Sequence, residues 1–216
     1  ESLFMRSMSI YEKTFGPEHD SVAATNNGLA ILYSKQARYA EAVTIYKRSL
    51  AIQENVFGPD HTNVALILNH LGNLYRKQGR YKEGLSLLKR SLAINENALG
   101  PDHLDLVGTI GYLAILYNEY GRFEEAESLQ MRAISIEEKV VGTDHPNLAT
   151  LLNNLAVMYK EQGRFEDAEA LNKRSLSIME KSFGPDHLHV TASLMNLGSI
   201  YYIQARYAEA ETLFKR

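Results

Sequence analysis

Apolar residues recur along this chain at intervals of three and four positions, the spacing of one face of an α-helix. Between residues 58 and 99, a first such series consists of Val64, Ile67, Leu68, Leu71, Leu74 and Tyr75. After a break at Gln78-Gly79-Arg80, a second series consists of Tyr81, Leu85, Leu88, Leu92, Ile94 and Leu99. No stretch alternates between apolar and polar residues as a half-buried strand would. The pattern predicts two antiparallel helices, A of about 16 residues and B of about 17–18.

Glycine and proline mark the end of the helix pair. Gly100 can adopt the left-handed conformation found after a helix, and Pro101 cannot continue one. Asp102 is placed to accept backbone N–H bonds, so we predict that it caps the next helix. Pro146, two residues after Asp144, is tolerated in a first helical turn because N–H groups there have no intrahelical partner.

The helix pair is repeated with a constant period of 42 residues and no insertion. The markers are Gly16-Pro-Glu-His19, Gly58-Pro-Asp-His61, Gly100-Pro-Asp-His103, Gly142-Thr-Asp-His145 and Gly184-Pro-Asp-His187. Residues 1–15 match the tail of a unit, so we expect them to form helix B of a truncated repeat. The repeats then run over 16–57, 58–99, 100–141, 142–183 and an incomplete 184–216, all in one solenoid domain. Since both ends fall inside a unit, we expect the chain to be a piece of a longer array.

A single helix pair cannot bury its apolar face, so neighbouring pairs must stack on one another. Small residues mark the expected close approaches, and three of them are the helical glycines Gly72, Gly84 and Gly198. A glycine inside a helix costs about 1 kcal/mol relative to alanine. These glycines therefore predict tight packing between helices.

Composition and charge exclude several classes of protein. The net charge of −3 argues against a nucleic-acid binder that works through bulk positive charge. The chain has no cysteine, which excludes disulfides, thiolate metal sites and a cysteine nucleophile and fits a reducing compartment. No apolar run approaches the ~20 residues of a membrane-spanning helix. We expect a cytoplasmic protein with neither nucleic acid nor membrane as a partner.

Two motifs carry a resemblance to a known family. The motif Leu-(Gly/Ala)-x-x-Tyr on helix A, followed by Gly-Arg-(Tyr/Phe)-x-Glu-Ala, resembles the tetratricopeptide repeat (TPR), although the period is longer than usual. With Gly-Pro-Asp-His between units and Leu152-Asn153-Asn154-Leu155-Ala156 on helix A, the chain is similar to the TPR domain of kinesin light chains. The resemblance implies an all-α fold, a right-handed superhelical solenoid of antiparallel helix pairs.

One departure from the family leaves the packing of the third and fourth repeats open. The aromatic residue expected midway along helix B is present as Tyr46 and Phe214 but is replaced by Leu88, Gln130 and Asn172.

The resemblance also implies that the A helices line a concave groove, with groove positions in three rows. The first row is Asn27, Asn69, Gly111, Asn153 and Met195. The second row is Gly28, His70, Tyr112, Asn154 and Asn196. The third row is Ser34, Arg76, Asn118, Lys160 and Tyr202, with Asn73 and Ser199 between the rows. We predict that peptide binding uses Asn27, Asn69, His70, Asn73, Arg76, Tyr112, Asn118, Asn153, Asn154, Lys160 and Asn196.

The chemistry of these rows suits an extended peptide. An Asn amide offers two donors and one acceptor, which match a backbone C=O and N–H. Arg76 and Lys160 would favour acidic side chains, although Glu119 and Glu161 partly offset them. The alternative interpretation is that these Asn residues are simply solvated or cap neighbouring helices.

Other recurring residues have simple structural interpretations. The histidines of the inter-repeat loops lie in separate layers, so we assign them to capping or loop packing rather than to a metal. His187 and His189 could clip an ion but lack an evident third ligand. The recurring Arg three residues before an acid, as in Arg80 and Glu83, predicts an ion pair within the repeat. The glutamates Glu12, Glu54, Glu96, Glu138 and Glu180 are interpreted as helix-end partners or a solvated face.

We find no catalytic motif and expect no enzyme activity, no metal and no cofactor. The leading hypothesis is a non-enzymatic interaction module whose concave groove binds an extended, acidic-leaning peptide segment of a protein partner. The alternative is a structural spacer, or a scaffold that self-associates end to end, next to an effector domain outside this sequence.

Overall fold

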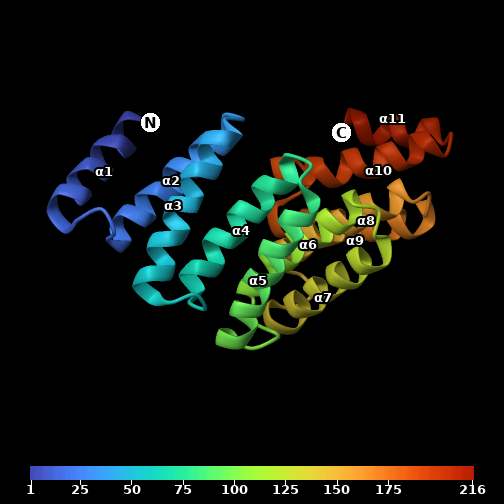
Figure 1. Ribbon diagram of the computed structural model, residues 1–216. Helices are drawn as coiled ribbons and strands as arrows, with labels where there is room; N and C mark the ends of the chain where they lie inside the picture. Colours follow the sequence, from blue (N-terminus) through green and yellow to red (C-terminus); the bar gives the residue numbers. More distant parts are fainter. The chain divides into compact units, whose positions relative to one another are not determined.

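The computed structural model describes residues 1–216, and it is all helical, without a β-strand (Figure 1). The chain forms two compact units, Glu1–Leu116 and Tyr117–Arg216, which are described separately below. The alternation of helices A and B predicted from the apolar pattern is confirmed in both units.

The first unit contains α1 to α5 and most of α6. The bounds are Ser2–Phe15 for α1, Asp20–Lys35 for α2, Tyr39–Phe57 for α3, Thr62–Lys77 for α4, Tyr81–Leu99 for α5 and Asp105–Glu119 for α6. Helices α2, α4 and α6 are the A helices, and α1, α3 and α5 are the B helices. Helix α2 pairs with α3 and helix α4 with α5, and α3 also packs on α4.

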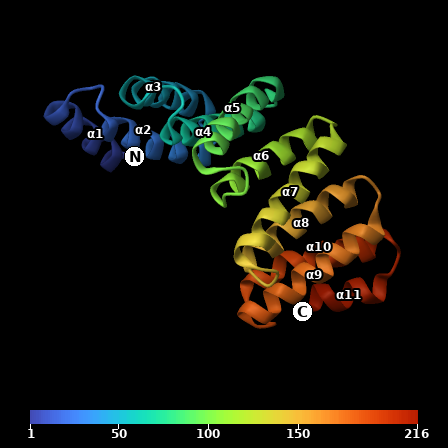
Figure 2. The ribbon, with the colours of Figure 1, turned by 90° about the horizontal axis from the view of Figure 1, so that it is seen from below.

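The second unit begins within the last turn of α6. Its further bounds are Phe123–Val141 for α7, Pro146–Glu161 for α8, Phe165–Phe183 for α9, Leu188–Val190 for the 3₁₀ turn η1, Thr191–Ile203 for α10 and Tyr207–Lys215 for α11. Helices α8 and α10 are A helices, and α7, α9 and α11 are B helices. The pairs α8–α9 and α10–α11 pack side by side (Figure 2).

The loop histidine caps α2, α4, α6 and α8 and, in the last repeat, the 3₁₀ turn η1 before α10; this corrects the prediction that Asp102 is the cap of α6. The amide N–H of Asp105 donates to Nδ1 of His103 over 3.2 Å. The same bond joins Ser21, Asn63, Asn147 and His189 to the histidine two residues earlier, over 3.1–3.3 Å. The five histidines of the inter-repeat loops are therefore helix caps, which is one of the two roles predicted for them.

The core of the first unit is a layer between consecutive repeats. Leu29 and Ala30 of α2, Tyr46 of α3, and Leu71 and Leu74 of α4 form one buried cluster. Buried serine hydroxyls add hydrogen bonds that the apolar pattern does not reveal. Ser49 Oγ donates to the carbonyl of Ala23, Ser91 Oγ to that of Ala65, and Ser175 Oγ to that of Ala149, over 2.7–2.8 Å.

A clamp built around the recurring arginine closes each repeat. The guanidinium of Arg164 lies 3.7 Å from the ring centre of Tyr159 and donates to Asp167 over 2.9 Å. It also donates over 2.8 Å to Glu127, which accepts the Tyr159 hydroxyl over 2.6 Å. The ion pair within the repeat was predicted, but the third member from the preceding B helix, Glu127, was not.

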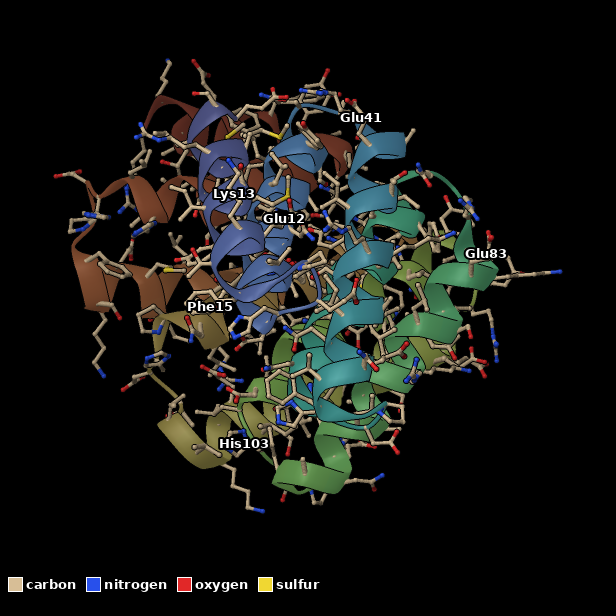
Figure 3. The ribbon with its side chains drawn as sticks, turned by 60° about the vertical axis from the view of Figure 1, so that its left-hand side comes forward. Glu12, Lys13, Phe15, Glu41, Glu83 and His103 are labelled. Atoms are coloured by element: carbon tan, nitrogen blue, oxygen red, sulfur yellow. The ribbon has the colours of Figure 1, made fainter.

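Two further repeats share this complete clamp, and two lack the third carboxylate. Glu1 serves Tyr33 and Arg38, and Glu169 serves Tyr201 and Arg206. In the second repeat, which lacks the third carboxylate, Arg80 still pairs with Glu83. Glu83 lies in the first turn of α5, as Glu41 does in the first turn of α3 (Figure 3). The hydrogen bond from Arg80 lowers the pKa of Glu83.

Ion pairs also link successive B helices. Glu12 pairs with Arg48 over 2.6 Å, Glu54 with Arg90 over 2.8 Å, and Glu138 with Arg174 over 2.6 Å. Their side chains are roughly one-third exposed, so each pair contributes about 0–1 kcal/mol. The glutamate row therefore belongs to the outer, B-helix side of the array.

The structure answers the open question about helix B in the third and fourth repeats. Gln130 is fully buried and donates over 2.9 Å to the carbonyl of Leu151. Asn172 is 1% exposed, and neither atom of its amide has a hydrogen-bond partner. An amide thus replaces the aromatic side chain in both repeats, with a partner in one and none in the other.

The helical glycines fall into two classes. A Cβ on Gly72 would lie 2.7 Å from Cγ of Leu88, so the packing of α4 on α5 requires this glycine. Gly84 and Gly198 are equally crowded. By contrast, a Cβ on Gly108 or Gly111 of α6 would meet no atom within 4 Å. Packing therefore explains the first class and leaves the two glycines of α6 unexplained.

The histidine cap can be tested at α4. We expect His61→Ala to lower the free energy of unfolding by about 1 kcal/mol, the typical value of an N-cap. His61→Asn is the matched control, because it also loses the ring stacked on Phe57 but keeps a side-chain acceptor. Chemical denaturation followed by circular dichroism measures both. Equal losses in the two variants would show that the cap contributes nothing.

The two classes of glycine predict opposite effects of the same substitution. Gly111→Ala should raise the free energy of unfolding by about 0.5–1 kcal/mol, because alanine favours the helix and the space is open. Gly72→Ala should lower it by about 1–2 kcal/mol, because overpacking exceeds the gain in propensity. Urea midpoints of the two variants compare them directly. A stabilising Gly72→Ala would contradict the crowded contact.

Candidate functional site

The first row of the predicted groove residues lies on the solvent-facing side of the A helices, with one exception. Asn27, Asn69 and Gly111 are partly exposed, and Met195 is 60% exposed. The side-chain oxygens of Asn27 and Asn69 are shut off from solvent and have no partner. Both residues are partly exposed as a whole, so part of each side chain reaches the surface.

Asn153, the exception, belongs to a buried hydrogen-bond chain in the second unit. It is 8% exposed, and its Nδ2 donates to Oγ of Ser193 on α10 over 3.0 Å. The Ser193 hydroxyl lies 3.0 Å from Oγ of Ser175 on α9, which donates to the carbonyl of Ala149 on α8. Each hydroxyl donates once and accepts once along this chain. Asn153 thus ties three helices together.

The second row faces the preceding B helix. The ring of His70 stacks on Tyr46 of α3, with ring centres 5.9 Å apart and an angle of 20°. Burial lowers the pKa of His70 and raises that of Tyr46. In the first repeat Phe4 of α1 packs where a Cβ on Gly28 would stand. Tyr112, Asn154 and Asn196 share this row and are partly exposed.

The third row lies near the C-terminal ends of the A helices, and its members already contact protein groups. Nε of Arg76 donates to Oδ1 of Asn73 over 3.0 Å. Asn118 donates to Glu161 over 2.8 Å in the second unit. Lys160 donates to Ser199 over 3.4 Å. These contacts hold the side chains in place along the same side of the helices as the first row.

A pocket of ≈ 370 Å³ in the first unit is lined by residues of α4, of the C-terminal end of α5 and of the start of α6. Its lining includes Leu66, Asn69, Asn95, Leu99, Asp105 and Thr109. Of these, only Asn69 was among the predicted site residues. No single position in the repeat signals the pocket, because its residues come from three helices and two repeats.

The histidines form no metal site. The rings of His187 and His189 lie 4.9 Å apart and pack on Phe183. No three His, Asp or Glu side chains gather where one ion could bind. None of the helices combines the length and hydropathy that a bilayer span requires.

Comparison with known proteins places this architecture in a family. The tetratricopeptide repeat family model matches residues 1–55, 22–83, 63–139, 105–181 and 147–216, which together cover the chain. The chain belongs to the tetratricopeptide repeat family. TPR folds are scaffolds that bind protein or peptide partners, and the family is typically non-catalytic. No curated protein matches the chain in sequence.

Solved structures resemble this TPR chain over most of its length. A Podosopora anserina protein assigned as a kinesin light chain, with nearly identical TPR-like repeats, is 25% identical with a TM-score of 0.77, covering 91% of this chain and 93% of its own. BtubC (BKLC) from P. vanneervenii is 20% identical with a TM-score of 0.82, covering 100% and 87%. The apo form of RapI is 16% identical with a TM-score of 0.72, covering 89% and 68%. The last two show the fold alone.

The hydrogen bonds that begin at Asn153 predict that its substitution costs stability, whereas substitution of the neighbouring Asn154 does not. Asn153→Ala should lower the free energy of unfolding by about 1–3 kcal/mol, because it removes the donor to buried Ser193. Asn154→Ala, at a partly exposed position on the same helix, is the control and should cost less than about 0.5 kcal/mol. Denaturant titration of both variants measures the difference. Equal costs would contradict the buried chain.

The lowered pKa of His70 predicts a pH dependence. As pH falls below the ordinary histidine value of about 6.5, the unfolded chain takes up a proton that the folded ring resists. Folding stability should therefore fall with acidification, and His70→Gln should reduce that slope. The measurement is the free energy of unfolding between pH 7.5 and 5 for both proteins. Parallel curves would show that burial of His70 has no such effect.

Proposed function

We propose that this TPR chain is a non-enzymatic interaction module that binds an extended segment of a partner protein along the solvent-facing sides of its A helices. In the first unit this surface comprises α2, α4 and the start of α6. In the second unit it comprises α8 and α10. Within each unit, this surface is the part of the predicted concave groove that the A helices line.

The observation that carries the proposal is the pair of outward-facing amides at Asn27 and Asn69. They occupy the same position of consecutive A helices, both side chains are partly exposed, and no bond to the protein engages their oxygens. We take the Nδ2 group of each as the donor to a bound chain. A peptide in extended conformation offers carbonyl acceptors along its length. Two donors in one row can therefore hold such a chain without reading its sequence.

Side chains around this row would supply the specificity. Lys35 and Lys77 are exposed at the ends of α2 and α4, beside Arg76. These cations favour acidic residues in the part of the ligand that passes the C-terminal ends of these helices. In the second unit Glu161 and Lys160 balance each other, so the preference for acid belongs to the first unit. His70 and Asn153 contribute by shaping the surface through their packing.

A peptide-display screen on the full chain, followed by fluorescence anisotropy with the selected peptide, tests the proposal. The double variant Asn27→Ala/Asn69→Ala should raise Kd about tenfold, the equivalent of about 1.4 kcal/mol. Asn63→Ala is the matched control, an exposed Asn of α4 outside the three rows. An unchanged Kd in the double variant, at unchanged helicity, would contradict the proposed surface.

Exposed apolar residues favour a second candidate function, self-association as a scaffold. Ile10 on α1 is 53% exposed, whereas Ile52 and Ile94 at the same repeat position are 1% and 4% exposed. Leu3 is 79% exposed on the same helix. If this face mediates assembly, Ile10→Lys should convert oligomers to monomers in sedimentation velocity. A wild-type chain that is monomeric at high concentration would exclude this candidate.

A further inference from the structure

The pocket between α4 and α6 is a local departure from the repeat. The same region of the second unit, two repeats further on, differs from it in two places. In the second unit Asn153 donates a hydrogen bond to Ser193. The residues at the same repeat positions of the first unit, Asn69 and Thr109, both line the pocket. In the second unit the rings of Phe183 and His189 pack with their centres 4.8 Å apart. The residues at the same repeat positions of the first unit are Leu99 and Asp105, which line the pocket. At the second place the first unit has the smaller side chains, Leu and Asp instead of Phe and His, and these leave more space.

The pocket combines apolar sides with one charge. Leu66 is 49% exposed and Leu99 is 37% exposed, although both are large apolar residues. Asp105 is the one charged residue of the lining, and its side chain is 71% exposed. Asn95 and Thr109 add polar groups to the same lining. The pocket therefore suits a side chain with an apolar stem and a cationic end.

We propose that this pocket binds an arginine side chain of an extended partner segment. The proposal rests on the peptide-binding function above and adds a residue preference to it. The arginine stem would lie between Leu66 and Leu99. Its guanidinium would pair with the Asp105 carboxylate, because the planar fork matches a carboxylate in two parallel hydrogen bonds. Lysine would bind more weakly, because its compact ammonium is more strongly hydrated.

The surface next to the pocket is shaped to admit a peptide backbone. Gly108 lies on α6 one turn after Asp105, and no packing contact requires it. Without a side chain there, the helix leaves room for a second chain to approach closely. Across the pocket, the partly exposed amide of Asn69 would donate from Nδ2 to a carbonyl of that chain. The arginine would thus enter the pocket from a backbone held at its edge.

The test is an NMR titration of the full chain with a single capped residue, N-acetyl-L-arginine N-methylamide. Its citrulline analogue has almost the same shape without the charge. We expect saturable shifts of the amide signals of Asn69, Asp105 and Thr109 with the arginine probe. The citrulline probe should bind about fivefold more weakly, the range of an exposed ion pair. Raising the salt concentration should reduce this difference.

Two variants that borrow residues from other repeats keep the test free of folding artefacts. Asp105→Asn introduces the residue found at Asn63 and Asn147, and should bring arginine and citrulline to equal affinity. Leu99→Phe introduces the residue found at Phe57 and Phe183, and should fill the pocket and abolish both shifts. Asp186→Asn, an exposed carboxylate of the second unit, is the charge-matched control and should change nothing.

The outcomes separate this inference from the proposed function. If citrulline binds as tightly as arginine at the same residues, the arginine preference is wrong and a peptide-binding surface stands. If neither probe shifts the pocket residues while a displayed peptide still depends on Asn27 and Asn69, the pocket is overturned alone. Equal binding by wild type and Asp105→Asn also overturns it.

Discussion

The structure depends on the contact between each helix pair and the A helix that follows it. Leu29 and Tyr46 become buried only when Leu71 and Leu74 of the next repeat cover them. Apolar burial of this kind contributes about 1.5–3 kcal/mol for each large side chain, so the layer between repeats holds most of the stability. Because each layer is complete in itself, the helices need no common centre, and the solvent-facing side of every A helix is left for other uses.

Polar contacts then fix the register of the layers. The clamp of Arg164, Tyr159 and Glu127 joins a turn to the preceding B helix, and the serine bonds join B helices to A helices through buried carbonyls. Each such bond is worth only about 0.5–1.5 kcal/mol, but it recurs along the array. Because the same contacts recur, equivalent residues of successive repeats take equivalent exposed positions. Differences between repeats at these positions, such as Asn69, Gly111 and Asn153, therefore decide what each part of the surface can bind.

The period of the sequence was sufficient to predict the helices, their order and their turns, because each depends on neighbours within one or two repeats. The cap was assigned to Asp102 instead of His103 because acid is the commoner capping residue, and histidine serves here through its Nδ1. Glu127 was missed because its partners lie 32 and 37 residues away. The burial of Asn153 depends on Ser193, and the pocket depends on residues of three helices. Neither can therefore be predicted from a single position of the repeat.

The central claim is that a partner segment lies on the exposed sides of the A helices. Hydrogen–deuterium exchange of the full chain, with and without a peptide selected by display, tests it most directly. The account predicts that bound peptide slows exchange in α2, α4 and the start of α6, or in α8 and α10, and leaves the exposed ends of α3, α5 and α9 unchanged. Protection confined to the B helices would contradict the claim.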